Sequence, residues 1–448
     1  MFKKVLIANR GEIAMRVIRA CRSLGIRTVA VHSTADEGAL HVRFADEAVC
    51  IGPPEATQSY LNIPAIIAAA EVTGADAVHP GYGFLSERSD FAEICGQCRL
   101  KFIGPTPAAM RAWGDKVAAR AQAVRFGLPL LPGSGVLESP AHARSEAIRV
   151  GFPVILKAAG GGGGRGMRVV RDEGEVENAF LLATAEAAKS FGNPDVYLER
   201  FVERPRHIEF QVLADTHGGV WTLGERECSL QRRHQKVIEE APSVAMTEEK
   251  RAEIGERIRV AIRETGYHTL GTLEFLMDER GELYFMEMNT RVQVEHPVTE
   301  SVTGVDLVEQ QLVSASGAAV SLPDTRPWRF RGHAIECRIN AEDPKSFAPW
   351  PGLITEYHPP GGGGVRVDSG VFGGWRVPSC YDSLIAKVIS FGSTRQEAIA
   401  KMRVALDEFI IGGIRTNIPL HQALLQHPDV LSGSMSTRTI EELVQAGF

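Results

Sequence analysis

The sequence predicts an α/β protein with several domains, and three observations support this fold class. A short apolar strand (residues 3–8), a helix (13–24) and a second strand (28–32) follow one another with short connections, as at the start of a parallel sheet. Two later apolar strands flank five consecutive glycines, Gly160–Gly164. Residues 271–297 predict an antiparallel hairpin with polar side chains on one face. The 448 residues leave room for about two to four domains.

Composition and charge exclude several classes of protein. The chain is 44% hydrophobic and 23% charged, which is ordinary for a globular protein, and its net charge of −6 gives no basic face for nucleic acid or anionic membrane. No apolar run approaches the ~18 residues of a membrane span. The start, MFKKVLIANRGE, turns polar too early for a signal peptide, so we expect a cytoplasmic protein. The seven cysteines are scattered, and Cys95-x-x-Cys98 has no second pair at zinc spacing, which predicts reduced structural thiols.

A glycine-rich loop, HPGYGFLSE (residues 79–87), follows the strand-like pair Ala77-Val78. Open α/β sheets bind ligands at the carboxyl ends of their strands, so Tyr82 and Glu87 are the best side chains of this loop to meet a ligand. A simple turn is the alternative. Because no G-x-G-x-x-G is followed by an acidic residue, a dinucleotide site is disfavoured.

The glycine run Gly160–Gly164 differs from a P-loop, which needs Gly-Lys-Ser/Thr and a following helix. Here a strand (167–171) follows, and another (153–158) precedes. We therefore expect a hairpin tip that closes over phosphates as a lid, with Lys157 as a point charge at its base. A flexible surface loop is the alternative.

Further elements follow from local pattern. Residues 105–114 form a boundary, a helix at 115–127 begins with Lys116, and Pro and Gly residues at 129–135 make a linker. We also expect a helix at 140–149, strands at 196–202 and 207–212, a polar cationic loop at 229–236, a helix at 247–266 started by Thr247, a helix at 306–314, a linker at 318–330, a strand at 333–338, a turn at 361–364 and a helical tail from 394.

The hairpin of residues 271–297 carries the strongest chemical signal. A two- or four-residue loop centred on Asp278–Gly281 pairs Glu274 with Phe285, and strand alternation then puts Phe285, Glu287 and Asn289 on one face. Glu287 becomes the diagonal neighbour of Glu274, at roughly 7–8 Å. Two carboxylates and an amide oxygen suit Mg²⁺. A solvated polar face is the alternative, and a three- or five-residue loop would separate the two carboxylates.

Arg291, Gln293 and Glu295 leave this hairpin in alternation with Val292 and Val294. If the chain stays extended, they point one way. A cation, an amide and a carboxylate in that order suit a small anion with a removable proton, because arginine binds it bidentately and glutamate accepts the proton. A surface strand with charges for solubility is the alternative.

The chain resembles biotin carboxylase, an ATP-grasp enzyme. The runs that carry the resemblance span nearly the whole chain: IANRGEIA, HPGYGFLSE, GGGGGRGM, PRHIEFQVL, SLQRRHQKVIEEAP, FMEMNTRVQVEHPVTE and AIECRINAEDP. The resemblance implies an N-terminal parallel-sheet domain (1–113), an ATP-grasp domain (114–330) with a mobile glycine-rich lid at about 130–203, and a C-terminal domain (331–448).

The resemblance also implies the chemistry: ATP phosphorylates bicarbonate to carboxyphosphate, the released phosphate deprotonates biotin, and the biotin enolate attacks CO₂. It places the divalent metals, Mg²⁺ or Mn²⁺, on Glu274, Glu287 and Asn289. The implied ATP contacts are Lys116, Lys157, Gly163, Gly164, His207, Gln231 and His234, with Glu199, Arg200, Phe201 and Val202 around the adenine. The implied bicarbonate contacts are Lys236, Arg291, Gln293, Val294 and Glu295, with Glu295 as base, and Arg338 and Tyr82 are implied to face biotin.

Two departures from the family pattern lie outside the implied site residues. Arg88 adds a charge beside the biotin loop, and the run Gly361–Gly364 lacks a bulky residue near the region through which members commonly dimerise. The sequence around Lys401 is helical and unlike a biotin-attachment turn, so the biotin carrier and the carboxyltransferase should be separate chains. We expect a homodimer in acetyl-CoA carboxylase for fatty acid synthesis, with propionyl-CoA or pyruvate carboxylase as alternatives.

Two rival functions belong to other classes. Another ATP-grasp ligase, joining a carboxylate to an amine, would share the metal carboxylates and the glycine lid. Arg291, Gln293, Glu295 and Arg338 favour bicarbonate and biotin instead. A catalytically dead nucleotide sensor should have lost a metal carboxylate or the base, and the sequence keeps them all.

Overall fold

The computed structural model describes residues 1–159 and 167–448. Its N-terminal part is a five-stranded parallel sheet of order β3-β2-β1-β4-β5. The predicted strand–helix–strand opening is confirmed as β1, α1 and β2. This part contains β1 (Lys4–Ile7), α1 (Gly11–Ser23), β2 (Arg27–Ser33), α2 (Leu40–Phe44), β3 (Glu47–Gly52), α3 (Ile63–Thr73), β4 (Ala77–His79), α4 (Ser89–Gln97) and β5 (Lys101–Phe102).

Short polar side chains start the helices that leave this sheet. The Thr106 side chain accepts a hydrogen bond from the Ala109 amide at the start of α5 (Pro107–Gly114), and Asp115 accepts one from Ala118 at the start of α6 (Lys116–Arg125). The predicted boundary at 105–114 is therefore a helix. Asp115 turns the chain out of α5 and puts Lys116 in the first turn of α6.

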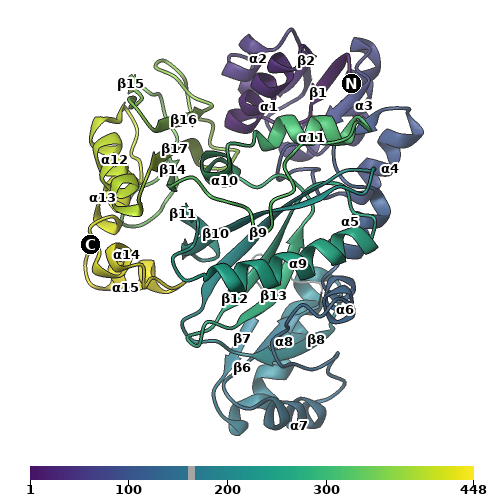
Figure 1. Ribbon diagram of the computed structural model, residues 1–448, viewed down its shortest axis with the longest axis vertical. Helices are drawn as coiled ribbons and strands as arrows, with labels where there is room; N and C mark the ends of the chain where they lie inside the picture. Colours follow the sequence, from purple (N-terminus) through teal and green to yellow (C-terminus); the bar gives the residue numbers. More distant parts are fainter. Residues whose placement is uncertain (160–166) are drawn as a thin grey trace.

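A second, eight-stranded antiparallel sheet crosses the middle of the molecule in the order β13-β12-β9-β10-β11-β14-β17-β16 (Figure 1). Its strands are β9 (Arg206–Ala214), β10 (Val220–Arg232), β11 (Gln235–Ala241), β12 (Thr269–Met277), β13 (Leu283–Asn289), β14 (His333–Asn340), β16 (Val365–Ser369) and β17 (Leu384–Gly392). Helix α9 (Glu248–Glu264) packs against β9 and β10, and α10 (His296–Thr303) packs against β10, β11 and β14. Helix α11 (Leu307–Ala315) packs between α1 and β12 and so ties the two sheets together.

One predicted loop is wrong. Residues 229–236 do not form a polar loop; they are the ends of β10 and β11 around a turn. Arg233 and His234 both adopt positive φ angles, 49° and 65°, which is the backbone of the two-residue turn that fits the twist of a hairpin. The polar, cationic composition suggested a loop, but the strand residues on either side of this turn are mostly buried, and Arg233, His234 and Gln235 are exposed.

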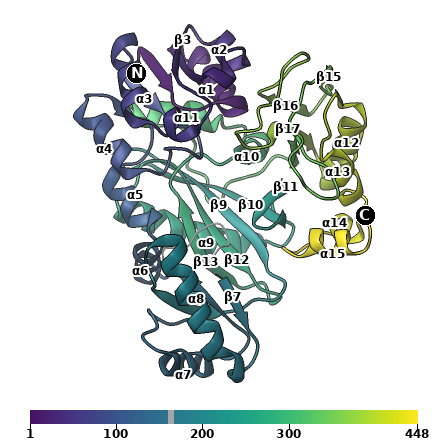
Figure 2. The same cartoon turned by 180° about the vertical axis from the view of Figure 1, so that it is seen from behind.

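A three-stranded sheet of order β7-β6-β8 lies at the end of the molecule farthest from the N-terminal sheet (Figures 1 and 2). It consists of β6 (Val154–Ala158), β7 (Met167–Val170) and β8 (Val196–Arg200), covered by α7 (Pro140–Val150) and α8 (Val176–Phe191). These elements share a hydrophobic core of their own, which includes Leu156, Val170, Phe180 and Leu198. The glycine run predicted as a lid tip lies within residues 160–166, outside the described residues.

The C-terminal part adds helices to the far edge of the eight-stranded sheet. It contains β15 (Glu356–His358), α12 (Arg395–Glu408), β18 (Ile410–Gly412), α13 (Ile418–Leu424), α14 (Pro428–Ser432) and α15 (Thr439–Gln445). The predicted helical tail is confirmed apart from β18, which pairs with β15. Helix α12 packs on β17 and β14, and buries Met402 and Leu406 in a core with Ile385 and Val388.

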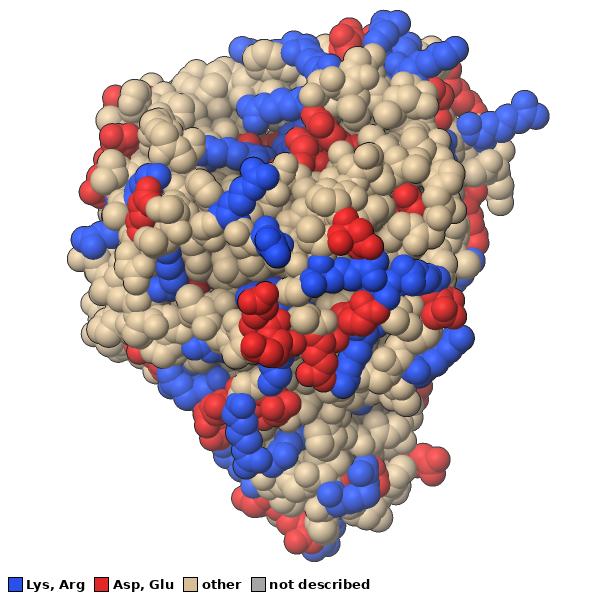
Figure 3. All heavy atoms as spheres, in the orientation of Figure 1, with Lys and Arg blue, Asp and Glu red and all other residues tan. Residues whose placement is uncertain are grey.

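The surface agrees with the charge balance of the sequence. On the face drawn in Figure 3, acidic and basic side chains are interspersed. The seven cysteines are all free thiols. Over residues 1–159 and 167–448, no helix is both long and apolar enough to cross a membrane.

Candidate functional site

The register of the β12–β13 hairpin differs from the predicted one. The ladder ends at the pair Met277–Leu283, so the loop is Asp278–Glu282, five residues instead of two or four. Phe275 pairs with Phe285, and both rings lie in the core, so the prediction that Phe285 shares a face with Glu287 is wrong. Without a further irregularity, this loop would have put the two carboxylates on opposite faces.

A β-bulge at Met286 returns the Glu274 and Glu287 side chains to the same face of the hairpin. The register shifts by one residue between Phe275 and Glu274, so that Glu274 lies directly opposite Glu287 instead of opposite Met286. A bulge adds one residue to one strand and reverses the alternation beyond it. The two carboxylates therefore do share a face, at the close spacing of a direct pair and not at the expected diagonal one.

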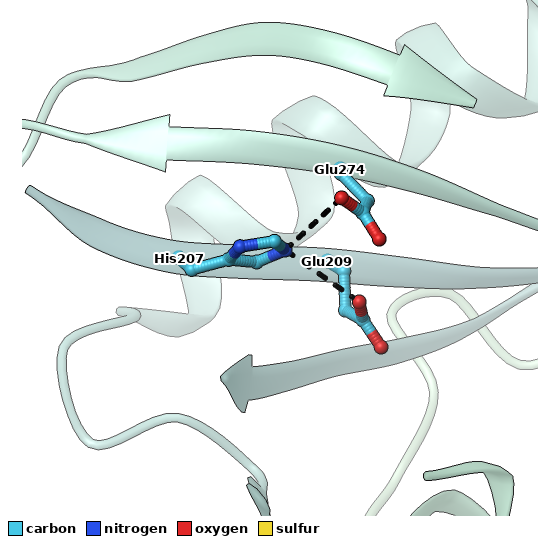
Figure 4. A group of neighbouring side chains, drawn as sticks. All are labelled: His207, Glu209 and Glu274. Carbon is cyan, nitrogen blue, oxygen red and sulfur yellow. Dashed lines mark ion pairs between the residues drawn. The ribbon is translucent and has the colours of Figure 1, made fainter. Parts of the chain in front are cut away.

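Strand β9 brings an imidazole and a third carboxylate to this face. His207 and Glu209 alternate along β9, Glu274 is opposite Glu209 on β12, and the three side chains point toward one another (Figure 4). His207 Nε2 lies 3.3 Å from Glu274 Oε2 and 3.7 Å from Glu209 Oε2. Burial opposes protonation of His207, but the adjacent Glu274 carboxylate outweighs it and raises the pKa to about 9. The imidazole is therefore cationic at neutral pH.

Lys236 is the centre of the acidic group. Its ammonium contacts Glu209, lies 3.1 Å from Glu274 Oε1 and donates to Glu295 Oε1 at 2.6 Å. Burial alone would lower the pKa of Lys236, yet the three carboxylates raise it well above its usual range. Lys236 thus stays charged and draws groups from β9, β12 and residue 295 to one point.

The segment after the hairpin is not an extended strand, contrary to the condition on which its alternation was predicted. It turns at Val294 and Glu295 directly into α10. The predicted side chains still converge: Arg291 Nη1 donates to Gln293 Oε1 at 2.8 Å, and Gln293 Nε2 donates to Glu274 Oε1 at 3.1 Å. Glu295 reaches Lys236 instead of Arg291.

Arg338, from β14, approaches Glu295 from the other side. Its Nη2 lies 2.9 Å from Glu295 Oε2, and its Nε lies 2.6 Å from Glu239 Oε1. The Glu295 side chain is fully buried between Lys236 and Arg338. Burial and Glu209 oppose its ionisation, but these two cations prevail and lower its pKa. Burial raises the pKa of Glu239 to about 7.

The predicted nucleotide contacts form two sets of ion pairs. In the first, Lys157 of β6 donates to Glu199 Oε2 at 2.5 Å, and Arg120 of α6 contacts the same carboxylate. In the second, Lys116 Nζ, also on α6, lies 3.8 Å from Glu287 Oε2. The remaining predicted residues lie as follows: Arg200 is exposed at the end of β8, Phe201 and Val202 are half-buried just beyond it, Gln231 is buried on β10 and His234 is exposed in the turn after it. Gly163 and Gly164 lie outside the described residues.

The loop after β4 meets the hairpin's exit. Glu87, which the sequence predicts to meet a ligand, accepts hydrogen bonds from Arg291 Nε at 2.9 Å and from the Thr290 amide at 3.1 Å. The Tyr82 hydroxyl donates to Glu12. Arg88 pairs with Asp90 at the surface, at 2.9 Å from Nε to Oδ1, so its additional charge is neutralised locally.

Four groups that contact this site were not predicted. Arg226, fully buried, donates to Glu209 at 2.5 Å and to Gln211 at 2.7 Å and so fixes the polar face of β9. Glu209 itself had a visible signal, because the alternation His207-x-Glu209-x-Gln211 puts it beside His207. Glu239 and Lys387 had no such signal, because the sequence of their strands shows no regular alternation of polar and apolar residues.

The donor set fits a hard cation. Glu274 and Glu287 offer carboxylate oxygens on one face, and partial burial and the neighbouring Glu274 raise the pKa of Glu287. A divalent cation would relieve this repulsion. Asn289 presents its Nδ2 to Glu274 at 2.8 Å and its Oδ1 to Arg291 at 3.2 Å, so its oxygen is already engaged. Among the described residues, two groups of three His, Cys, Asp or Glu side chains have ligand atoms within 4.8 Å of one another, His207–Glu209–Glu274 and Glu209–Cys228–Glu295, and neither includes Glu287.

Comparison with known proteins gives consistent matches along the chain. Three family models match: "Biotin carboxylase, N-terminal domain" at residues 1–110, "Carbamoyl-phosphate synthase L chain, ATP binding domain" at 115–322 and "Biotin carboxylase C-terminal domain" at 336–442. A biotin carboxylase of Haemophilus influenzae is 56% identical over 444 residues, 99% of each chain. One of the pyruvate carboxylase subunits of Methanothermobacter thermautotrophicus is 51% identical, and the match covers 99% of this chain and 90% of that one.

Solved structures agree with the fold. A biotin carboxylase from Campylobacter jejuni superposes with a TM-score of 0.95 at 47% identity and covers 99% of both chains. The biotin carboxylase domain of a 2-oxoglutarate carboxylase from Hydrogenobacter thermophilus gives 0.93 at 48%, covering 99% of this chain and 98% of its own. With the fold, the carboxylates and the cations of the site described, these matches lead to one conclusion: the chain has the ATP-grasp fold and belongs to the biotin carboxylase family of ATP-dependent ligases.

Proposed function

We propose that this protein carboxylates biotin carried on a separate protein, with ATP and bicarbonate as cosubstrates and carboxyphosphate as intermediate. The observation that carries the proposal is the arrangement around Glu295: a fully buried carboxylate held between Lys236 and Arg338, beside the carboxylate face of the hairpin. In an amine ligase, the rival function, nothing would require a base enclosed by two cations at this place.

Glu295 is in the protonation state that a base requires. Lys236 and Arg338 lower its pKa, so it is ionised at neutral pH and able to accept a proton from bicarbonate. Lys236 and Arg291 supply positive charge for the anion, and Gln293 and the Val294 backbone complete its surroundings. Arg338 joins the bicarbonate base to the biotin side, where we assign it the stabilisation of the biotin enolate, with Tyr82 as a second contact.

For the nucleotide, Lys116, Lys157, His207, Gln231 and His234 supply charge and hydrogen-bond donors for phosphates. Glu199 to Val202 supply the adenine site, and Gly163 and Gly164 the covering loop. Glu274 and Glu287 would hold Mg²⁺ or Mn²⁺, with Asn289 as a third ligand once its oxygen is released from Arg291. The metal, when bound, neutralises developing negative charge on the phosphates. The Hydrogenobacter domain was solved with MgADP and bicarbonate, which supports this set of ligands.

The assembly belongs to the proposal as well. We favour acetyl-CoA carboxylase, with a biotin carrier protein and a carboxyltransferase as separate chains in fatty acid synthesis, because several biotin carboxylases are among the relatives. A homodimer is supported by the dimer named in one related structure. Relatives from pyruvate and 2-oxoglutarate carboxylases keep other acceptors open to test. The cytoplasmic location and the three-domain division at 113 and 330 stay predictions.

Two measurements test the function. Phosphate release from ATP should require added bicarbonate, and free biotin should yield trapped carboxybiotin. ATP hydrolysis that is indifferent to bicarbonate, or that depends on an amine instead, would contradict the proposal. Capture of the biotinylated partner from the native cell, with its carboxyltransferase, identifies the assembly.

A further inference from the structure

The run IANRGEIA was prominent in the sequence, yet none of its residues has a role in the site described so far. In the structure its polar side chains reach the biotin-side loop. Asn9, buried at 2% exposure, donates from Nδ2 to the Pro80 carbonyl at 2.8 Å and to the Tyr82 carbonyl at 2.7 Å. A side chain at Gly81 would lie 2.7 Å from this amide. Asn9 therefore fixes the backbone of the loop on both sides of Gly81.

Glu12 fixes the tyrosine side chain of the same loop. It lies in the first turn of α1 with 4% exposure, and its Oε1 accepts a hydrogen bond from the Tyr82 hydroxyl. Burial and the Glu12 carboxylate raise the pKa of the Tyr82 hydroxyl well above its usual range, so it remains a donor. The other oxygen, Oε2, lies 3.2 Å from the Lys387 ammonium.

Lys387 connects this pair to the bicarbonate side. Its side chain is fully buried on β17, directly across the ladder from Arg338. Besides facing Glu12, its Nζ donates to the carbonyl of Val294 at 2.7 Å. Val294 precedes Glu295 in the turn that opens α10. One ammonium thus links the first turn of α1 to the segment that carries the base.

The contacts of this pair distinguish it from an ordinary buried ion pair. Lys387 also faces Glu336 and Asp368, while the like charge of Arg366 opposes it, so Glu12 is not its only acidic neighbour. What Glu12 and Lys387 add is a continuous chain from Tyr82 through both side chains to the Val294 carbonyl. Its two ends are the segments that the proposed function assigns to biotin and to bicarbonate.

We propose that Glu12 and Lys387 are positioning residues for carboxyl transfer. Together they hold Tyr82 at a fixed place relative to the Val294–Glu295 turn, and this aligns biotin with the carboxyphosphate formed there. The inference rests on the proposed function of these two segments. Misplacing reacting groups by about 1 Å costs up to ~10²-fold in rate.

The first test is Glu12→Gln. An amide at this position has one oxygen and one nitrogen, so it cannot accept from Tyr82 and also face the Lys387 ammonium with an oxygen. We expect kcat/KM for free biotin to fall ~10-fold or more, while bicarbonate-dependent ATP cleavage without biotin changes less than ~3-fold. Unchanged kcat/KM for biotin, or an equal loss in both reactions, would overturn the proposal.

A double-mutant cycle with Tyr82→Phe identifies the route. If Glu12 acts through the tyrosine hydroxyl, Glu12→Gln should lower kcat/KM for biotin much less in the Tyr82→Phe background than in the unmodified protein. Equal losses in both backgrounds would mean that Glu12 acts by another route and would overturn the proposal. For Lys387, Lys387→Met should lower both reactions, and Lys387→Arg should recover part of each. If Lys387→Met does not fold, the Glu12–Tyr82 cycle decides alone.

The matched control is Glu225→Gln. Glu225 is also fully buried and is paired with Arg251 at 2.6 Å, but it lies between α9 and β10 and contacts neither Tyr82 nor Val294. Glu225→Gln should lower stability and leave kcat/KM for biotin unchanged. If it lowers kcat/KM for biotin as much as Glu12→Gln does, the effect of Glu12→Gln is a general consequence of neutralising a buried carboxylate, and the proposal is overturned. The proposed function fails separately, if the unmodified protein forms no carboxybiotin at all.

Discussion

Two side chains on opposite sides of Glu295 allow the steps of the reaction to be separated at the residue scale. Lys236 contacts Glu295 and the hairpin carboxylate Glu274, so under the proposed function we assign it to phosphoryl transfer. Arg338 contacts Glu295 and Glu239 but none of the hairpin carboxylates. Glu295 and Arg338, the proposed base and the proposed enolate-stabilising cation, are thus adjacent but differ in their surroundings.

From this difference we predict that Glu295→Gln loses both bicarbonate-dependent ATP cleavage and biotin carboxylation, by ~10²–10⁴-fold. Arg338→Gln should lose biotin carboxylation by a similar factor and keep much of the ATP cleavage seen without biotin. Phosphate release and trapped carboxybiotin measure the two reactions. If Arg338→Gln abolishes ATP cleavage as completely as Glu295→Gln, Arg338 belongs to the phosphoryl-transfer site.

Glu287 offers a second residue-scale test. Its side chain is 40% exposed, lies opposite Glu274 and has Lys116 nearby as a cation partner. Glu287→Gln should raise the Mg²⁺ concentration needed for half-maximal activity ~10-fold or more, because one anionic ligand is lost. Excess Mg²⁺ or Mn²⁺ should restore part of the activity. Normal ATP binding with no rescue by either metal would make the metal role untenable.

At the scale of elements, β4 and the loop after it depend on one neutral histidine. His79 is fully buried, accepts at Nδ1 from the Gly81 amide at 3.0 Å and faces Gln311 Oε1 with Nε2 at 3.1 Å. Protonation of Nδ1 would place two N–H groups against each other. Burial in this setting lowers the pKa of His79 to about 3.

The direction of the pH dependence follows from this shift. An unfolded histidine has a pKa of about 6.5, so between pH 6.5 and 3 the unfolded chain binds the additional proton, and stability falls as the pH falls. The stabilisation is complete above about pH 6.5. Between pH 8 and pH 5 the contribution of His79 falls by about 2 kcal/mol. His79→Gln should therefore be less stable at pH 8 but lose less stability on acidification.

Chemical denaturation of both proteins at pH 8 and pH 5 measures this effect. His358→Gln, at an exposed position on β15, is the control and should behave as the unmodified protein. An identical loss in the His79 variant and the unmodified protein would show that His79 does not titrate on unfolding. Buried His41 and His421, each with a pKa lowered to about 4, remain in both proteins and cancel in the comparison.

At the scale of the whole molecule, the β7-β6-β8 sheet and its helices have a hydrophobic core of their own, which allows them to move as one body. Its elements pack on one another, and it carries Lys157 and Glu199, two of the proposed nucleotide contacts, which are hydrogen-bonded to each other. We predict that this part, residues about 130 to 203, moves as a body over a bound nucleotide. A non-hydrolysable ATP analogue should then increase hydrogen-exchange protection in β6 and β8, with α12 unchanged as an internal control. Equal exchange of β6 and β8 in both states would rule the movement out.

Local pattern in the sequence was enough to predict much of this molecule. Alternation along residues 207–212 and 271–289 identified the strands that carry the polar face, and the order of the motifs identified the family over nearly the whole chain. Side chains two residues apart on a regular strand share a face, so His207 and Glu209 were readable together. Local rules also gave the strand–helix–strand opening and the Thr247 start of α9.

The parity of the hairpin and the partners of the buried charges depend instead on packing across the whole chain. The bulge at Met286 reverses the alternation, and it forms because Phe275 and Phe285 must both enter the core while Glu287 faces the site. The chain of contacts from Tyr82 through Glu12 and Lys387 to Val294 joins residues that are far apart in the sequence. A buried charge must find a partner in space, and the packing of distant strands and helices, not local pattern, determines which partner is near.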